Sequence, residues 1–149
     1  MHDKSLSVVV RRTFSSPRQR VFHAFSSAEN IAHWLTPDSS IKMTVLAMTF
    51  EPQGRFRLQY DEPDGGHDIV GGIFQHIQSP EKLIFSWIWE APHEFANMAT
   101  QVTVEFIDQG DQSEVVLTHR KFLSQDACER HQQGWEGALA NLSTELTDH

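Results

Sequence analysis

The last stretch of the chain, residues 124–149, constrains the fold most, because it carries one long helical pattern with a mixed apolar face. Its buried-type side chains recur at steps of three or four residues, as on one side of an α-helix; they are Cys128, His131, Trp135, Ala138, Leu142 and Leu146. A helix that only closed a core would carry Leu or Ile in place of His131 and Trp135. The pattern predicts a helix, begun by Ser124, that faces a partly open cavity.

The preceding residues predict one strand, two short helices and then a run of strands. Residues 6–14 alternate with a period of two, and capping signals at Ser16 and Ser26 predict a short helix after each. Turn residues then divide residues 41–122 into about six short strands, each with one apolar face. This order predicts an α+β fold in which a curved antiparallel sheet of about seven strands wraps around the C-terminal helix.

Three glycines fall inside these predicted elements. Gly71 and Gly72 interrupt a strand pattern and predict a bulge or a sharp bend there. Gly134 lies within the long helix, where glycine costs ~1 kcal/mol relative to alanine. We therefore expect Gly134 either to let the helix approach the sheet or to leave room for a ligand.

Length and composition narrow the class of protein. The 149 residues suit one domain over residues 1–149. A net charge of −8 repels phosphate backbones and anionic membranes, so nucleic acid is not an expected partner. No apolar run reaches the roughly 18 to 20 residues that cross a bilayer, so no membrane insertion is expected. One cysteine and no signal-peptide pattern predict a cytoplasmic protein, and a homodimer remains open.

His119 and His131 both have the phase of the buried face, and two interpretations remain open. A buried neutral histidine needs hydrogen-bond partners, so both rings can be structural, which is the interpretation we favour. The pair can also orient a ligand carbonyl or hydroxyl, or one ring can act as an acid or base near neutral pH. Their separation matches no zinc spacing. We expect no metal and no cofactor, and no catalytic residue is assigned.

The chain is rich in aromatic residues on predicted buried faces. Aromatic walls with a few polar tips form pockets for apolar ligands, and they also fill cores, so we expect about half of the set to touch a cavity. The predicted ligand-binding residues are these aromatics and the two histidines: Trp34, Phe56, Tyr60, Phe85, Trp87, Trp89, His119, His131 and Trp135.

Two other side chains share predicted buried faces. Arg12 stands on the apolar face of the first strand and needs an acceptor, for which Glu51, Glu90 and Glu105 are candidates, or else a ligand anion. Cys128 shares the helix stripe and is expected to behave as a small hydrophobe, since a nucleophile would need a base and an orienting group.

Several segments, in this order along nearly the whole chain, resemble the single-domain homologues of the activator of heat-shock protein 90 ATPase, within the START-like (SRPBCC) helix-grip superfamily. The matching segments are residues 12–14, 16–17, 21–22, 33–37, 54–56, 72–74, 79–87, 117–119 and 131–135, followed by Leu139 and Leu142. The resemblance implies a helix-grip fold. Members of the superfamily generally bind apolar or amphipathic small molecules between sheet and helix, some are cyclases or hydrolases, and the eukaryotic co-chaperone activates a heat-shock ATPase.

Three hypotheses about function follow. The leading one is a binding module that holds an apolar or amphipathic small molecule between the sheet and the last helix. The second is a cyclase- or hydrolase-like enzyme in which His119 or His131 moves a proton. The third is a protein-interaction module that acts on a chaperone or another partner, for which an exposed apolar patch on the convex face of the sheet would be evidence.

Overall fold

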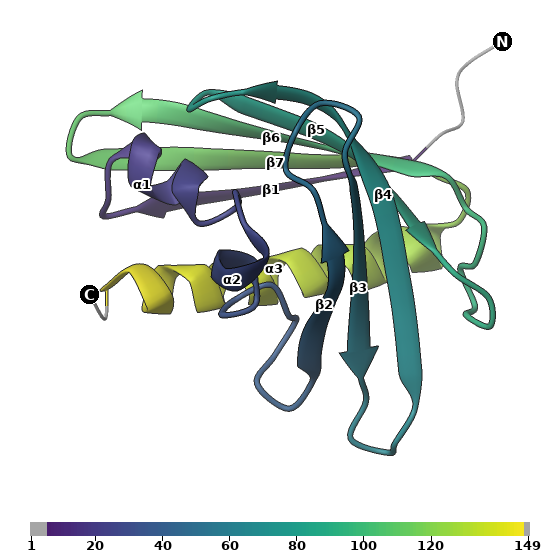
Figure 1. Ribbon diagram of the computed structural model, residues 1–149. Coiled ribbons are helices and arrows are strands. Elements are labelled where there is room, and N and C mark those ends of the chain that lie inside the picture. The colour runs from purple at the N-terminus through teal and green to yellow at the C-terminus, as the bar shows by residue number, and fades with distance from the viewer. Residues whose placement is uncertain (1–5, 148–149) are drawn as a thin grey trace, which may run out of the picture.

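The computed structural model describes residues 6–147, in which seven strands form one antiparallel sheet around a long helix (Figure 1). The elements in chain order are β1 (Leu6–Phe14), α1 (Arg18–His23), α2 (Ala28–Ile31), β2 (Lys42–Met48), β3 (Arg55–Asp61), β4 (His67–Gln78), β5 (Lys82–Trp89), β6 (Thr100–Gln109), β7 (Gln112–Phe122) and α3 (Gln125–Thr147). The predicted α+β helix-grip fold is confirmed.

The sheet is continuous and strongly curved. Its strand order is β1-β7-β6-β5-β4-β3-β2, so consecutive strands from β2 to β7 are neighbours and β1 pairs with the last strand. Figure 1 shows β1, β6 and β7 on one side of α3 and β2, β3 and β4 passing across it, so that the sheet curls around the helix. The concave face of the sheet and α3 therefore enclose the interior between them.

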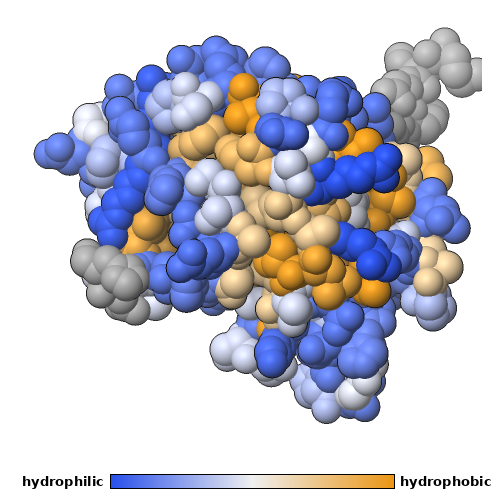
Figure 2. Space-filling model, viewed as in Figure 1, coloured by the Kyte–Doolittle hydropathy of each residue, from blue (hydrophilic) through white to orange (hydrophobic). Residues whose placement is uncertain are grey.

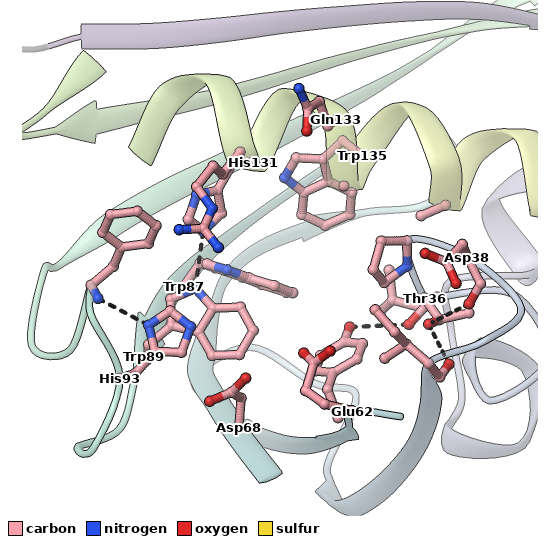
Figure 3. A pocket seen from close by; sticks show the side chains of 18 of the residues that line it. Thr36, Asp38, Glu62, Asp68, Trp87, Trp89, His93, His131, Gln133 and Trp135 are labelled. Carbon is pink, nitrogen blue, oxygen red and sulfur yellow. Dashed lines mark hydrogen bonds between the residues drawn. The ribbon is translucent and has the colours of Figure 1, made fainter. Parts of the chain in front are cut away.

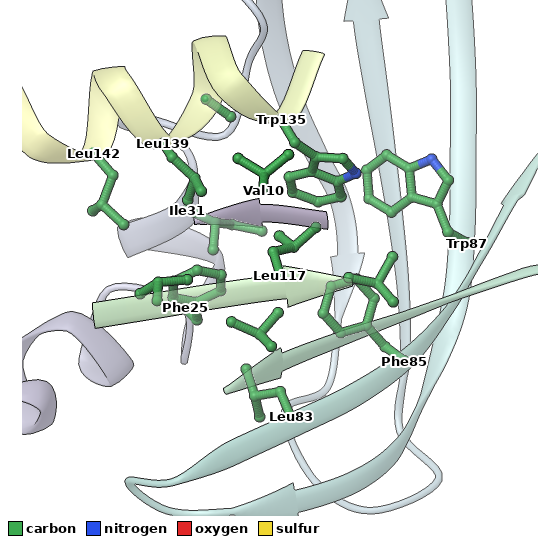
Figure 4. Packing of buried hydrophobic residues seen from close by; sticks show 14 of the residues in the cluster. Val10, Phe25, Ile31, Leu83, Phe85, Trp87, Leu117, Trp135, Leu139 and Leu142 are labelled. Atoms are coloured by element: carbon green, nitrogen blue, oxygen red, sulfur yellow. The ribbon is translucent and has the colours of Figure 1, made fainter. Parts of the chain in front are cut away.

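The hydrophobic core fills the part of this interior that faces the C-terminal half of α3. Leu139 and Leu142 of α3 are fully buried, as is Leu117 of β7. Figure 4 shows the two α3 leucines pointing toward the sheet, in the layer that also holds Val10 and Ile31. Each such side chain stabilises the fold by about 1.5–3 kcal/mol through burial.

The start of α3 is as the sequence predicts. Ser124 Oγ accepts a hydrogen bond from the Ala127 backbone N–H at 3.1 Å, and Asp126 lies in the first turn, where the helix dipole favours an acidic residue. The predicted stripe is buried at Cys128, Trp135 and the positions that follow it. Burial raises the pKa of the Cys128 thiol, which fits the expected role as a small hydrophobe.

The two short helices exist, but each begins later than its predicted cap. Pro17, in an extended conformation, is the residue before α1, and no side chain caps that helix. Ser27 caps α2 by accepting a hydrogen bond from the Asn30 N–H at 3.1 Å. The hydroxyl of Ser26 instead donates to the His23 carbonyl at 2.7 Å, at the end of α1.

The expectation that Arg12 is buried is wrong. Its side chain is exposed, although it follows the phase of Val8 and Val10. β1 is an edge strand, and a long side chain near its end can leave the apolar face for water. Of the three carboxylates considered for it, Glu90 pairs with Arg57, at 2.7 Å.

The two glycines of β4 lie close to atoms of the neighbouring strands, where a side chain would not fit or would be crowded. A Cβ on Gly72 would lie 1.9 Å from the Ser86 carbonyl oxygen of the neighbouring strand. Gly71 pairs with Arg57 of β3, and the Arg57 side chain lies beside it. That side chain forms its ion pair with Glu90, the residue after β5. The register of β4 shifts only later, between Phe74 and His76, so the predicted irregularity is present but the bulge lies beyond the glycines.

Two glycines of α3 have opposite surroundings. A Cβ on Gly137 would lie 1.9 Å from the Pro37 carbonyl oxygen, so this residue lets the helix contact the segment after α2. A Cβ on Gly134 would have no atom within 4 Å. The close approach considered for Gly134 therefore belongs to Gly137, and Gly134 leaves room.

This pair gives a matched test of the packing. Gly137→Ala should lower the free energy of unfolding by about 1–3 kcal/mol, because the new methyl group meets backbone. Gly134→Ala should raise it by up to about 1 kcal/mol, because alanine has the higher helix propensity and meets nothing. Urea denaturation of both variants measures the difference, and a Gly137→Ala chain as stable as the unsubstituted protein would contradict the packing described.

Candidate functional site

An open cleft of about 580 Å³ lies between the N-terminal half of α3 and the sheet (Figure 3). Four other parts of the chain complete it: the segment after α2, the hairpin end of β3 and β4, the end of β5, and the loop that follows β5. The lining residues are Leu35, Thr36, Pro37, Asp38, Ile41, Tyr60, Glu62, Asp68, Trp87, Trp89, His93, Glu94, Phe95, Arg130, His131, Gln133, Gly134, Trp135 and Ala138.

Aromatic rings form the inner wall of the cleft. Trp87 and Trp89 alternate with Ile88 on β5, so both project from the same face of the strand, and Trp135 of α3 meets Trp87 with ring centroids 5.1 Å apart. Tyr60 lies 5.9 Å from Trp89, and its hydroxyl donates to the Leu35 carbonyl at 3.0 Å. Burial raises the pKa of Tyr60, so its hydroxyl remains a neutral donor.

His119 lies behind this wall in a complete hydrogen-bond chain. The Trp135 indole N–H donates to His119 Nδ1 at 2.9 Å, so that nitrogen carries no proton. His119 Nε2–H then donates to Thr100 Oγ1 at 2.7 Å, and the Thr100 hydroxyl donates to the Trp87 carbonyl at 2.5 Å. The chain joins α3 to β7, β6 and β5 and leaves neither ring nitrogen of His119 free.

His131 is held by a second tryptophan. The Trp89 indole N–H donates to His131 Nε2 at 2.9 Å, and His131 Nδ1–H donates to the Ala127 carbonyl one turn back at 2.8 Å. Each histidine thus accepts a hydrogen bond from an indole N–H and donates its own ring N–H to an oxygen. The two rings, with centroids 5.1 Å apart, are neutral and carry their protons on opposite nitrogens.

Electrostatics keeps both rings neutral. Burial, with a smaller effect of His131, lowers the pKa of His119 well below its ordinary value. Burial also lowers the pKa of His131, although its bond to Ala127 acts in the other direction. At these two positions the unfolded chain therefore binds protons that the folded chain does not, so the two histidines lower the stability as the pH drops below about 6.5.

The rim near the start of α3 carries His93 and Arg130. His93 stacks on Trp89 with ring centroids 4.4 Å apart and an interplanar angle of 4°, and its Nδ1 accepts the Phe95 N–H at 2.9 Å. Burial lowers the pKa of His93. Arg130 forms a salt bridge with Glu94 and lies over the Phe95 ring, 5.6 Å from its centroid. The charge of Arg130 is therefore already balanced.

The opposite rim is acidic. Asp38 lies after α2, Glu62 follows β3, and Asp68 is near the start of β4. Ser40 donates both its hydroxyl and its backbone N–H to Asp38, which lowers the pKa of that carboxyl. Burial raises the pKa of Glu62, and the negative charge and hydrogen bond of Asp68 act in the same direction.

Five of the nine predicted site residues line the cleft: Tyr60, Trp87, Trp89, His131 and Trp135. The other four lie in the interior around it. Trp34 is 1% exposed and donates its indole N–H to the Ala24 carbonyl at 3.0 Å. Phe56 and Phe85 contact each other in the aromatic core, and His119 supports Trp135 from behind.

Sequence periodicity missed the polar rim. Four of its residues, Asp38, Glu62, His93 and Glu94, lie in turns and loops, where alternation does not indicate which way a side chain points. The other two are Asp68, near the start of β4, and Arg130, in α3. One signal was present, because Glu62 begins the turn that follows Tyr60 on the same hairpin. Within residues 6–147, no group of three His, Cys, Asp or Glu side chains is placed to hold a metal ion.

Comparison with known proteins shows to which family the chain belongs. The model of the family described as activator of Hsp90 ATPase homolog 1-like protein matches residues 15–147. The chain belongs to this family. No curated protein matches it. Among the described residues, no helix has the length and apolar character needed to span a membrane.

Solved structures of bacterial proteins share the fold. The AHSA1 protein of Silicibacter pomeroyi is 19% identical with a TM-score of 0.84, covering 97% of this chain and 100% of that one. A putative uncharacterized protein of Rhizobium leguminosarum is 22% identical with a TM-score of 0.81, covering 98% and 97%. A protein of Arthrobacter aurescens is 18% identical with a TM-score of 0.84, covering 97% and 87%. At such identities the likeness shows the fold alone.

The hydrogen-bond pattern makes a prediction about the two histidines. Long-range proton–nitrogen NMR should find His119 with its proton on Nε2 and His131 with its proton on Nδ1. Both should be neutral at pH about 6.5, where an unperturbed histidine is half protonated.

Two tryptophan variants supply the control. Trp135→Phe removes the donor to His119 and should change the His119 ring signals, whereas Trp34→Phe removes an indole that bonds only backbone and should leave them unchanged. Half protonation of either ring at pH about 6.5 would contradict the assignment.

Proposed function

We propose that this chain binds an apolar or amphipathic small molecule in the cleft between α3 and the sheet. The observation that carries the proposal is an aromatic wall facing open space, at a point where the helix has Gly134 in place of a side chain. A cleft of about 580 Å³ is within the size range of small-molecule sites. Family membership supports the proposal through the fold, which suits such binding.

The hydrogen bonding of the histidines favours binding over proton transfer. A general base needs a free lone pair within reach of the substrate. The lone pairs of His119 and His131 both accept indole N–H groups, and both rings are neutral. An enzyme using either ring would first have to break a bond that holds the wall of the cleft.

A protein partner is the other function considered. Figure 2 shows apolar residues gathered on the outer face of the β2–β4 part of the sheet, where Leu46 is 42% exposed and Ile69 and Ile73 are half-buried. The exposed ion pair of Arg57 and Glu90 adds charged groups to this part of the sheet. The cleft is continuous and concave, which favours it as the binding site.

A helix variant tests the cleft. Gly134→Leu places an apolar side chain in the open space and should weaken binding of the fluorescent probe phenylnaphthylamine at least tenfold. The expected size follows from lost contact with methylene-sized groups at about 0.8 kcal/mol each, since about 1.4 kcal/mol is tenfold. Fluorescence titration measures the affinity.

The matched control is Gln132→Leu, which adds the same side chain to the same helix at an exposed position outside the lining. It should bind the probe as the unsubstituted chain does. Equal affinity of the Gly134→Leu and Gln132→Leu chains, or no binding by the unsubstituted chain, would refute the cleft as the ligand site.

A further inference from the structure

One hydrogen-bond donor in the cleft wall has no partner. Trp89 and Trp135 donate their indole protons to the two histidines, but Trp87 Nε1 is buried and unpaired. Trp87 is only 5% exposed, and it lines the cleft at the end where Trp89 and His131 lie (Figure 3). A buried donor left unmade costs about 1–3 kcal/mol. Because this nitrogen has no exposed surface in the ligand-free chain, an acceptor oxygen of a ligand would reach it only after a small shift of the neighbouring rings, and the bond would then remove that cost.

The negative charge of the acidic rim is not balanced by salt bridges among the described residues. Asp38, Glu62 and Asp68 have no salt-bridge partner within residues 6–147, and the lining cation, Arg130, is paired with Glu94. Asp68 and, more weakly, Asp38 both raise the pKa of Glu62, so each lies within electrostatic reach of that carboxyl. A cationic group at this rim would relieve the repulsion.

From these two features together we propose that the ligand is a cationic amphipath: a ring-sized apolar body against the aromatic wall, a protonated amine at Asp38, Glu62 and Asp68, and an oxygen acceptor for Trp87 Nε1. The proposal rests on the binding function proposed above and specifies its chemistry. An anionic ligand would meet the same rim at a cost, since the charges there are alike.

A set of three phenols tests the charge. Tyramine, tyrosol and phloretate share a hydroxyphenyl ring with a short chain, which ends in an ammonium, a hydroxyl or a carboxylate. Isothermal titration at neutral pH should find tyramine bound about tenfold more tightly than tyrosol, and phloretate bound least tightly. Equal binding of all three, or a preference for phloretate, would overturn the charge assignment and leave the cleft as a binding site. No binding by any of them would contradict both proposals.

Paired variants locate the effect. The Glu62→Gln/Asp68→Asn chain should lose the preference for tyramine over tyrosol. The control is Asp108→Asn/Asp111→Asn, which removes the same number of negative charges from the end of β6 and the turn after it, outside the lining, and should keep the preference. An unchanged preference in the first chain would place the amine elsewhere and overturn the assignment to this rim.

A comparison with phenethylamine tests the donor, because phenethylamine is tyramine without the ring oxygen. Trp87→Phe keeps an aromatic ring but removes the N–H, so it should weaken tyramine about three- to tenfold more than it weakens phenethylamine. Any loss of packing in the variant affects both ligands alike. Equal weakening of the two would show that Trp87 contributes only its ring and would overturn this part of the proposal.

Discussion

The hydrogen bond from the Trp135 indole to His119 fixes how α3 sits on the sheet. His119 is fully buried on β7, between β1 and β6. A histidine in that place is tolerable only with both nitrogens satisfied, and the Thr100 hydroxyl, which passes the chain on to the Trp87 carbonyl, completes the requirement. Because Trp135 is one partner, this hydrogen-bond chain joins the helix to three strands, and the cleft opens beside it.

The two halves of α3 consequently pack differently against the rest of the chain. Toward the C-terminus, Leu139 and Leu142 pack into the core, and Gly137 contacts the backbone at Pro37. Toward the N-terminus, large aromatic rings and His131 hold the helix away from a continuous hydrophobic contact, and Gly134 adds nothing to fill the gap. The cleft is therefore a consequence of which side chains α3 carries, with an aromatic wall and a charged rim to which loops, β4 and α3 all contribute.

Much of this was predictable from the sequence, because periodicity reports which residues share a face. The order of elements, the Ser124 cap and the mixed face of α3 follow from local patterns, and five aromatic or histidine positions predicted for the site line the cleft. Periodicity is misleading at Arg12, because its position in the alternation matches the buried residues of β1, but β1 is an edge strand and the long side chain reaches water. The rim carboxylates Asp38 and Glu62 lie in loops, where no period exists. The pairing of each tryptophan with one histidine depends on contacts between residues far apart in sequence.

The indole N–H signals of the four tryptophans give the most direct test that the cleft, and not the histidine pair, receives the ligand. In a tyramine titration followed by proton–nitrogen NMR, the Trp87 signal should move furthest and the Trp34 signal should stay in place. The Trp89 and Trp135 protons should keep their slow exchange with water, because they remain bonded to His131 and His119. A saturating titration in which Trp87 does not move, or in which the Trp89 or Trp135 proton becomes rapidly exchanging, would contradict this.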